Sequence, residues 1–312
     1  MDDVKILTPG GYTTIQDSGR FGYQNMGVPV SGVLDHFSFA VANCLVGNPE
    51  NTPVMEITVV GPTFEIFTET DIALTGAQMG IRVNGNAVEQ WQSVRVFPGD
   101  RVSIGQIESG CRAYLAFGGG PDLPDIMGSC STYVGAGIGG LNGRPLKPGD
   151  TFKLNRPCLL HERRRFPEDR IPVYPTHVTL RAVPGPQDDY FDIRTSPLFI
   201  TEYTVSAKAD RMGCRLTGES IPIKDGMPKS IVSEPSVPGS IQIPPDEQPI
   251  ILLVEQTVGG YAKIATIISS DIRRVAQITP GDTIRFKKID LQTAHKIHAE
   301  EKKRFQRLKE IF

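Results

Sequence analysis

The segment 11–23 joins a short β-type run to polar side chains on a glycine-rich loop. It opens with the β-formers Tyr-Thr-Thr-Ile, and residues 17–19 (Asp-Ser-Gly) then supply the chemistry of a turn. The loop carries an amide (Gln16), a carboxylate (Asp17) and a guanidinium (Arg20) beside glycines that leave backbone N–H groups accessible. These groups can hold a small polar ligand, and we predict that all three are catalytic. The alternative is a surface turn with an Asp–Arg pair.

Further glycine-flanked polar segments follow along the chain. Hydroxyls, amides and backbone N–H groups suit a planar, amide-like or urea-like ligand with little net charge. A guanidinium can hold a carboxylate or stabilise an oxyanion, so we add Arg211 to the predicted catalytic residues. The predicted substrate-binding residues are Ser31, Asp35, Ser129, Ser131, Thr132, Arg215, Gln242, Gln256, Thr257, Gly259, Gly260, Tyr261 and Lys263. We expect the two sets to meet in one pocket, unless the glycines only permit strand corners and bulges.

Several other kinds of site are excluded by the residues themselves. The stretch 135–140 matches G-x-G-x-x-G, but further turns follow it where a dinucleotide site needs a helix. The chain contains no G-x-x-x-x-G-K-[ST] sequence, so we expect any ATP to be bound by another chain. No C-x-x-C pair is present, His295 and His298 lack a third ligand, and we predict no metal site. Cys130 has no histidine near it in sequence, which argues against a cysteine nucleophile.

Composition indicates a β-rich protein with many turns. The 312 residues include 32 glycines and 25 prolines, about 18% against a usual 12% or so. The net charge of -2 gives no indication of a nucleic-acid or anionic-membrane partner. No apolar run approaches a membrane span, and we expect a cytoplasmic protein with reduced cysteines. These are Cys44, Cys111, Cys130, Cys158 and Cys214.

The elements that position these residues are mostly short strands. Pro-Gly-Asp turns at 98–100, 148–150 and 280–282 each precede an alternating strand, in both halves of the chain. A helix is expected from the Asp35 cap, another short helix at 186–193, and one long helix after Asp290. We predict a mainly β fold with domains at 1–160 and 177–312, joined by a connector at 161–176.

The same polar segments carry a family resemblance. The stretches that carry it include Tyr-Thr-Thr-Ile-Gln-Asp-Ser-Gly-Arg (12–20), Gly-Val-Pro-Val-Ser-Gly-Val-Leu-Asp (27–35), Gly-Ser-Cys-Ser-Thr (128–132), Ser-Glu-Pro (233–235), Ile-Gln-Ile-Pro-Pro (241–245) and Gly-Gly-Tyr (259–261). In this order they resemble the C subunit of prokaryotic 5-oxoprolinases. The family commonly has Asp-x-Gln-Thr-Thr-Gly-Gly-Tyr-Pro near the end, and this chain has Val254, Glu255, Val258 and Ala262 at the variable places.

The resemblance implies two tandem cyclophilin-like β-barrels with a few short helices and a C-terminal helix. It implies a tight hetero-oligomer with a protein like the B subunit, a further partner like the A subunit, and ATP-dependent conversion of 5-oxo-L-proline to L-glutamate. Two other family activities remain open. One is carboxyl transfer to urea or another amide, with biotin delivered on a separate carrier. The other is regulation, by binding an inhibitor of a histidine kinase.

Overall fold

The chain divides into two compact units, each of which is described by itself. The computed structural model describes residues 2–155 and 159–312, so that Cys158 lies outside the described residues. Unit 1 comprises Met1–Phe21, Ser31–Tyr174 and Phe305–Phe312. Unit 2 comprises Gly22–Val30 and Pro175–Arg304. The domain limits at 160 and 177 stay a prediction.

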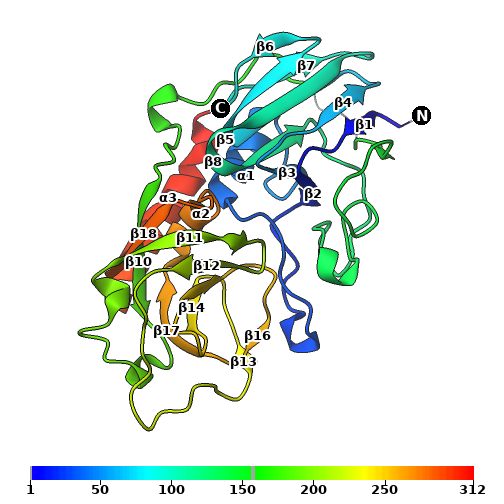
Figure 1. Cartoon of the computed structure of the whole chain (residues 1–312). Helices are drawn as coiled ribbons and strands as arrows, with labels where there is room; N and C mark the ends of the chain where they lie inside the picture. Colours follow the sequence, from blue (N-terminus) through cyan, green and yellow to red (C-terminus); the bar gives the residue numbers. More distant parts are fainter. Residues whose placement is uncertain (1, 156–158) are drawn as a thin grey trace. The chain divides into compact units, whose positions relative to one another are not determined.

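Unit 1 is built on one curled, antiparallel sheet (Figure 1). Its strands are β1 (Val4–Thr8), β2 (Tyr12–Gln16), β3 (Val54–Thr58), β4 (Thr63–Ile66), β5 (Thr70–Val83), β6 (Asn86–Val88), β7 (Val94–Val96), β8 (Arg101–Phe117) and β9 (Thr151–Phe152). The strand order is β2-β3-β8-β4-β1-β9, and β5 pairs with β6, β7 and β8. The β5–β8 pairing contains three register shifts, which bend long strands and help the sheet to curl.

Two apolar clusters cover the two faces of this sheet. Helix α1 (His36–Leu45) packs against β5 and β8. Tyr114 and Ala116 of β8 belong to the buried cluster that contains the apolar residues of α1. Leu115 and Phe117, which point to the opposite face, belong to the other cluster. The continuous apolar run in β8 is therefore explained by a strand that is buried on both faces.

Unit 2 is a closed barrel of seven strands (Figure 1). Its strands are β10 (His177–Pro184), β11 (Glu202–Ala209), β12 (Gly213–Thr217), β14 (Ser240–Ile243), β15 (Ile250–Leu252), β17 (Ala262–Ile267) and β18 (Thr283–Lys288). Around the barrel they follow the order β10-β17-β14-β15-β12-β11-β18. β10 and β18 are parallel, and the other neighbours are antiparallel. The predicted turn at 280–282 leads directly into β18.

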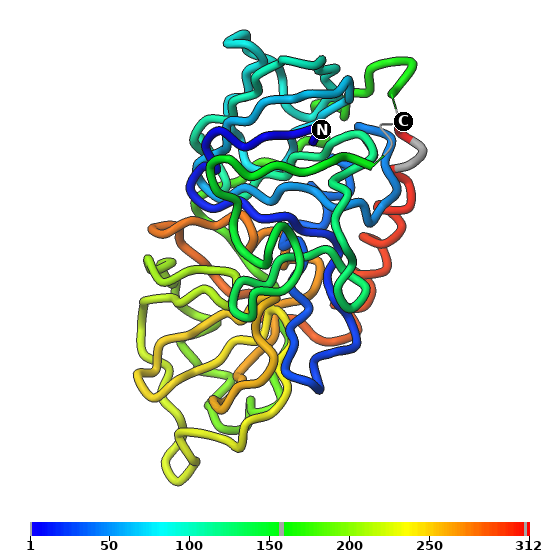
Figure 2. The backbone as a smooth tube through the Cα atoms, turned by 90° about the vertical axis from the view of Figure 1, so that its right-hand side faces the viewer, coloured from blue at the N-terminus to red at the C-terminus, as the bar shows by residue number. Residues whose placement is uncertain are grey.

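A separate two-stranded ribbon in unit 2 pairs β13 (Glu234–Pro235) with β16 (Val258–Gly259). The loop from 218 to 233 precedes it and is drawn in yellow-green to yellow in Figure 2. The remaining helices of the chain are α2 (Ser269–Val275), α3 (Leu291–Gln306) and the 3₁₀ turns η1 (Gln24–Met26), η2 (Val134–Ala136), η3 (Glu168–Arg170), η4 (Asp188–Tyr190), η5 (Pro197–Phe199) and η6 (Arg307–Glu310).

The predicted fold class is confirmed: the chain is mainly β, with barrel-type architecture, few helices and a helix near the C-terminus. The helix expected at 186–193 is reduced to η4, and residues 231–232 lie outside the strands, which resume at Glu234. Val232 is 90% exposed, so its β-branched side chain has no packed surface to join. No helix among residues 2–155 and 159–312 has the length and apolar character needed to cross a membrane.

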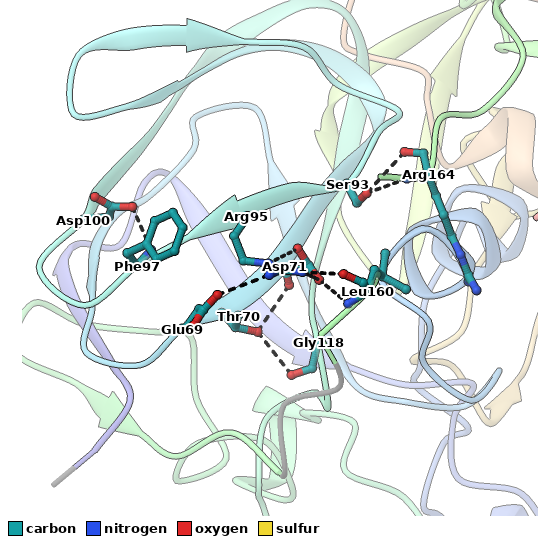
Figure 3. A network of polar contacts seen from close by, with 10 residues as sticks. All are labelled: Glu69, Thr70, Asp71, Ser93, Arg95, Phe97, Asp100, Gly118, Leu160 and Arg164. Atoms are coloured by element: carbon teal, nitrogen blue, oxygen red, sulfur yellow. Dashed lines mark hydrogen bonds and ion pairs between the residues drawn. The ribbon is translucent and has the colours of Figure 1, made fainter. Parts of the chain in front are cut away.

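Leu160, the residue that precedes the predicted connector, is fixed to the sheet of unit 1 through Arg95 on β7 (Figure 3). Arg95 donates to both carboxylate oxygens of Asp71, at 2.7 and 3.0 Å, and to Glu69. It also donates to the carbonyl of Leu160 at 2.7 Å, and the Leu160 N–H donates to Asp71 at 2.9 Å. A few residues farther on, Phe166 is 1% exposed. This stretch therefore packs on unit 1.

We predict that Arg95→Gln loosens this stretch while leaving the sheet intact. The change removes charge-assisted hydrogen bonds worth about 1–3 kcal/mol together. Hydrogen exchange at the Leu160 amide should become roughly tenfold faster or more. Arg82→Gln, which alters an exposed arginine of β5, is the matched control. Unchanged protection at Leu160 in Arg95→Gln would contradict the assignment.

Candidate functional site

The predicted residues of unit 1 at 16–20 and 129–132 lie around the carboxylate of Asp17, which is 2% exposed. Its Oδ1 accepts from Ser129 Oγ at 2.6 Å, Ser131 Oγ at 2.5 Å and the Gly19 N–H at 2.8 Å. Its Oδ2 accepts from the Cys130 N–H at 2.7 Å. We call residues 16–20 and 129–132 the Asp17 cluster. The carboxylate ties the β2 loop to the serine-rich segment.

Arg20 lies in the same cluster with no exposed surface. Its Nε donates to the carbonyl of Ile126 at 2.8 Å, and its Nη2 to the carbonyls of Ser129 and Ser131 at 3.2 and 3.0 Å. Burial lowers the pKa of this guanidinium, and the nearby Asp17 opposes that shift. Nη1 is buried without a partner among the described residues. Arg20 thus holds loop backbone through three carbonyls.

The other unit 1 residues also make mainly internal contacts. Gln16 donates to the Thr132 carbonyl at 3.1 Å, and its Oε1 is buried without a described partner. Asp35 caps α1 as predicted, since its Oδ1 accepts from the Ser38 N–H at 3.1 Å. Ser31 is 1% exposed, and its Oγ has no described partner. Their roles toward a substrate stay predictions.

Three side chains in or next to this cluster are of kinds that commonly bind metal ions. Ligand atoms of Asp17, Asp125 and Cys130 lie within 4.8 Å of one another. The Asp17 carboxylate already accepts four hydrogen bonds, and Cys130 Sγ donates to Asp125 Oδ1 at 3.0 Å. Burial, followed by the contact with Asp125, raises the pKa of this thiol to about 12. The ligand atoms of Asp17 and Cys130 are therefore already engaged in hydrogen bonds within the chain.

A second cluster lies in unit 2, on the outer face of the barrel. Lys263 of β17 is opposite Gln242 of β14, and the row continues through Ile250 of β15 to Arg215 of β12. Residues opposite one another in a sheet present their side chains on the same face. A register shift after Ile241 sets this alignment. Lys263 and Gln242 are 3% and 4% exposed.

Gln187, which precedes η4, fixes the backbone of Lys263. Its N–H donates to the Lys263 carbonyl at 3.2 Å, and its Oε1 accepts from the Lys263 N–H at 3.0 Å. Its Nε2 donates to Glu234 Oε1 at 2.7 Å. Lys263 Nζ lies 2.6 Å from the same oxygen. Contact with Lys263, and then with Gln187, lowers the pKa of the Glu234 carboxyl group.

We call Gln187, Glu234, Gln242 and Lys263 the Lys263 cluster. The Lys263 Nζ–Glu234 Oε1 contact is an ion pair that compensates the buried ammonium group. Gln242 Nε2 is buried without a described partner. A Cβ on Gly259 would lie 2.1 Å from this nitrogen, which explains why glycine stands there. The cluster thus has N–H groups to spare for a ligand.

The remaining predicted residues of unit 2 are more scattered. Gly260 pairs through its carbonyl with Ile231, Thr257 pairs with Ser236, and Gln256 Nε2 donates to the nearby Val258 carbonyl. Tyr261 is 38% exposed. Together with Gly259 these residues form or flank the β13–β16 ribbon, next to the Lys263 cluster.

The two arginines predicted in unit 2 are both paired with acids. Arg211 donates through Nε to Glu255 at 2.6 Å, and both side chains are buried. Arg215 forms a more exposed ion pair with Asp246. Glu255 stands at a variable place of the family pattern, and it provides the carboxylate that compensates Arg211. The expectation that unit 1 and unit 2 residues meet in one pocket stays a prediction.

Gln187 and Glu234 were missed as site residues by reasoning from the sequence. Glu234 lies within the quoted Ser-Glu-Pro stretch, where a single acid among turn residues was a usable signal. Gln187 follows Pro-Gly-Pro, a sequence that indicates only a turn. Its contact with Lys263 spans 76 residues, so sequence spacing gives no sign of it.

We predict that Asp17→Asn strongly destabilises unit 1. The new NH₂ group would face groups that now donate to the carboxylate, at a cost of about 3 kcal/mol. Trp91, the single tryptophan, is 5% exposed in unit 1, so its fluorescence during urea unfolding reports this unit. Asp122→Asn, at an exposed aspartate, should change the unfolding free energy by less than about 0.5 kcal/mol. Equal midpoints for the two variants would refute the role of Asp17.

We also predict that Cys130 is a slow target for iodoacetamide. A pKa of about 12 keeps the thiol protonated at pH 8, which leaves roughly a thousandfold less thiolate than an ordinary cysteine has. Its alkylation rate should still rise tenfold per pH unit up to pH 10, whereas an ordinary thiol levels off near pH 9. Peptide mass spectrometry of native and urea-unfolded chain measures both rates. Levelling below pH 9 in the native chain would contradict this.

Comparison with known proteins identifies the family to which the chain belongs. A model described as "Carboxyltransferase domain, subdomain A and B" matches residues 26–288. The chain is 37% identical to the 5-oxoprolinase C subunit of Escherichia coli over 307 residues, covering 98% of this chain and 97% of that protein. It is 35% identical to urea amidolyase of Lachancea kluyveri, covering 94% of this chain and 17% of that protein.

A solved structure gives the same result. The urea amidolyase of K. lactis superimposes with a TM-score of 0.93 at 31% identity, over 99% of this chain and 20% of that chain. Family match, full-length relatives and fold agree with the resemblance read from the sequence. The chain belongs to the family of carboxyltransferase domains with subdomains A and B, which includes the C subunits of 5-oxoprolinases.

Proposed function

We propose that this chain is the C subunit of a cytoplasmic 5-oxoprolinase, which opens 5-oxo-L-proline to L-glutamate with a B-type and an A-type partner protein. The observation that carries the proposal is the 37% sequence identity to the C subunit of the E. coli 5-oxoprolinase. The chain and its E. coli relative cover 98% and 97% of each other, whereas the chain corresponds to about a fifth of the urea amidolyases.

The donor groups of the Lys263 cluster suit a substrate that has both an amide and a carboxylate. The Lys263 ammonium and the Gln187 amide can bind the carboxylate of 5-oxo-L-proline, and the spare Gln242 N–H can donate to its lactam oxygen. A lactam resists direct attack by water because of amide resonance, so its carbonyl must be activated. In this proposal the chain binds and orients the ring.

The stretch 135–140, which matches the dinucleotide pattern, does not offer the geometry of a phosphate site. In the stretch 135–140, η2 is followed by Gly137 in a left-handed conformation, and no helix offers its N-terminus. Gly139 and Gly140 pack against Ser131 and Thr132, where a Cβ would clash at about 2 Å. The proposal therefore assigns ATP to the partner proteins.

Carboxyl transfer is the second candidate, favoured by the family match and by the TM-score of 0.93 with a urea amidolyase. A carboxylate delivered on biotin would meet the same ammonium and amide donors. Biotin would supply the activated carboxyl group, and Lys263 and Gln242 would hold its oxygens. Transfer from a biotinylated carrier to urea, with no glutamate formed from 5-oxo-L-proline, distinguishes this candidate from the first.

We predict that Lys263→Met abolishes turnover without preventing assembly. The chain is reconstituted with its A-type and B-type partners, and ATP-dependent glutamate release from 5-oxo-L-proline is measured. Loss of a charge that positions the substrate should lower the rate about a hundredfold or more. Lys208→Met, at an exposed lysine of β11, is the control and should retain full activity. Absence of glutamate release from well-folded wild-type proteins would refute the proposed function.

A further inference from the structure

Two donors of unit 2 converge on one oxygen of the chain's own Glu234. Lys263 Nζ lies 2.6 Å and Gln187 Nε2 2.7 Å from Glu234 Oε1. An ammonium and an amide N–H that share one carboxylate oxygen form a small oxyanion site. The lowered pKa of the Glu234 carboxyl group agrees with this arrangement.

The donors are held more firmly than the acceptor. Gln187 is bonded twice to the backbone of Lys263, and the Lys263 side chain is 4% exposed. The side chain of Glu234, by contrast, is 39% exposed and lies on a strand of two residues. Movement of Glu234 would leave the donor pair in place.

Gln242 provides an independent sign of a ligand. This residue is 4% exposed, and its Nε2 has no partner among the described residues. A buried N–H group without an acceptor costs free energy that a bound ligand would recover. Gln242 is the cross-strand neighbour of Lys263, so a ligand on the ammonium group can also reach this amide.

We propose that Lys263 and Gln187 form a carboxylate-binding site, and that Glu234 occupies it until the carboxylate of a small ligand takes its place. The exchange leaves one negative charge beside Lys263, so the buried ammonium group stays compensated. The ligand class is a small monocarboxylate with an uncharged amide oxygen that can accept from Gln242. Only the choice of 5-oxo-L-proline as a probe rests on the proposed function.

Glu234 then acts as an internal competitor. A ligand that binds only when Glu234 has left the site has its apparent affinity reduced by the fraction of molecules in that state. Glu234→Gln removes the competing charge and leaves the two donors. Carboxylate affinity should therefore rise at least tenfold in this variant.

The test is calorimetric titration of the purified full chain with 5-oxo-L-proline, acetate and 2-pyrrolidinone, which has the lactam but no carboxylate. The proteins are wild type, Glu234→Gln, Glu234→Gln with Lys263→Met, and Glu219→Gln as a control at an exposed glutamate of the same unit. Glu234→Ala serves as a second variant, and circular dichroism checks the fold of each protein.

We expect Glu234→Gln to bind 5-oxo-L-proline and acetate at least tenfold more tightly than wild type or Glu219→Gln, and the gain to vanish with Lys263→Met. Equal affinity in wild type and both Glu234 variants, undetectable binding in all of them, or an equal gain for 2-pyrrolidinone would overturn the inference. If the carboxylates behave as expected but the reconstituted complex forms no glutamate, the binding site stands and the proposed function fails.

Discussion

The burial of one ammonium group, that of Lys263, is the constraint on which the outer face of unit 2 depends. An uncompensated buried charge costs several kcal/mol, so the surrounding chain has to supply a negative partner and order it. The β13–β16 ribbon supplies Glu234, the turn before η4 supplies Gln187, and the register shift in β14–β17 brings Gln242 alongside. These features occur together beside one pair of barrel strands, as the proposed site for an anionic ligand requires.

In the Asp17 cluster of unit 1, the charged groups are satisfied mainly by hydrogen bonds to backbone and hydroxyl groups. Its carboxylate accepts four hydrogen bonds, and its guanidinium holds three backbone carbonyls, so the strongest donors and acceptors are largely satisfied within the chain. A satisfied network of this kind fixes the relative positions of distant loops. Asp17 and Arg20 thus mainly order backbone, whereas Lys263 and Glu234 compensate one another's charge beside the unpartnered Nε2 of Gln242.

The sequence was sufficient for the mainly β fold, the cap at Asp35 and the long helix, because these depend on local patterns. It also singled out Lys263, Gln242 and Gly259, which lie together in the structure, while their role toward a substrate stays a prediction. It could not identify Gln187, whose role depends on closure of the barrel across 76 residues. Nor could it show that Arg211 is compensated by Glu255, since ion pairing depends on which strand ends become neighbours.

In our proposal, the donors that contact Glu234 form a binding site for the carboxylate of the substrate. A crystal structure of the wild-type chain soaked with 5-oxo-L-proline tests it most directly. We expect the ligand carboxylate to contact Lys263 Nζ and Gln187 Nε2, and the lactam oxygen to lie near Gln242. The Glu234 side chain should be displaced toward solvent. A ligand bound elsewhere in the chain, with the Glu234–Lys263 pair intact, would contradict it.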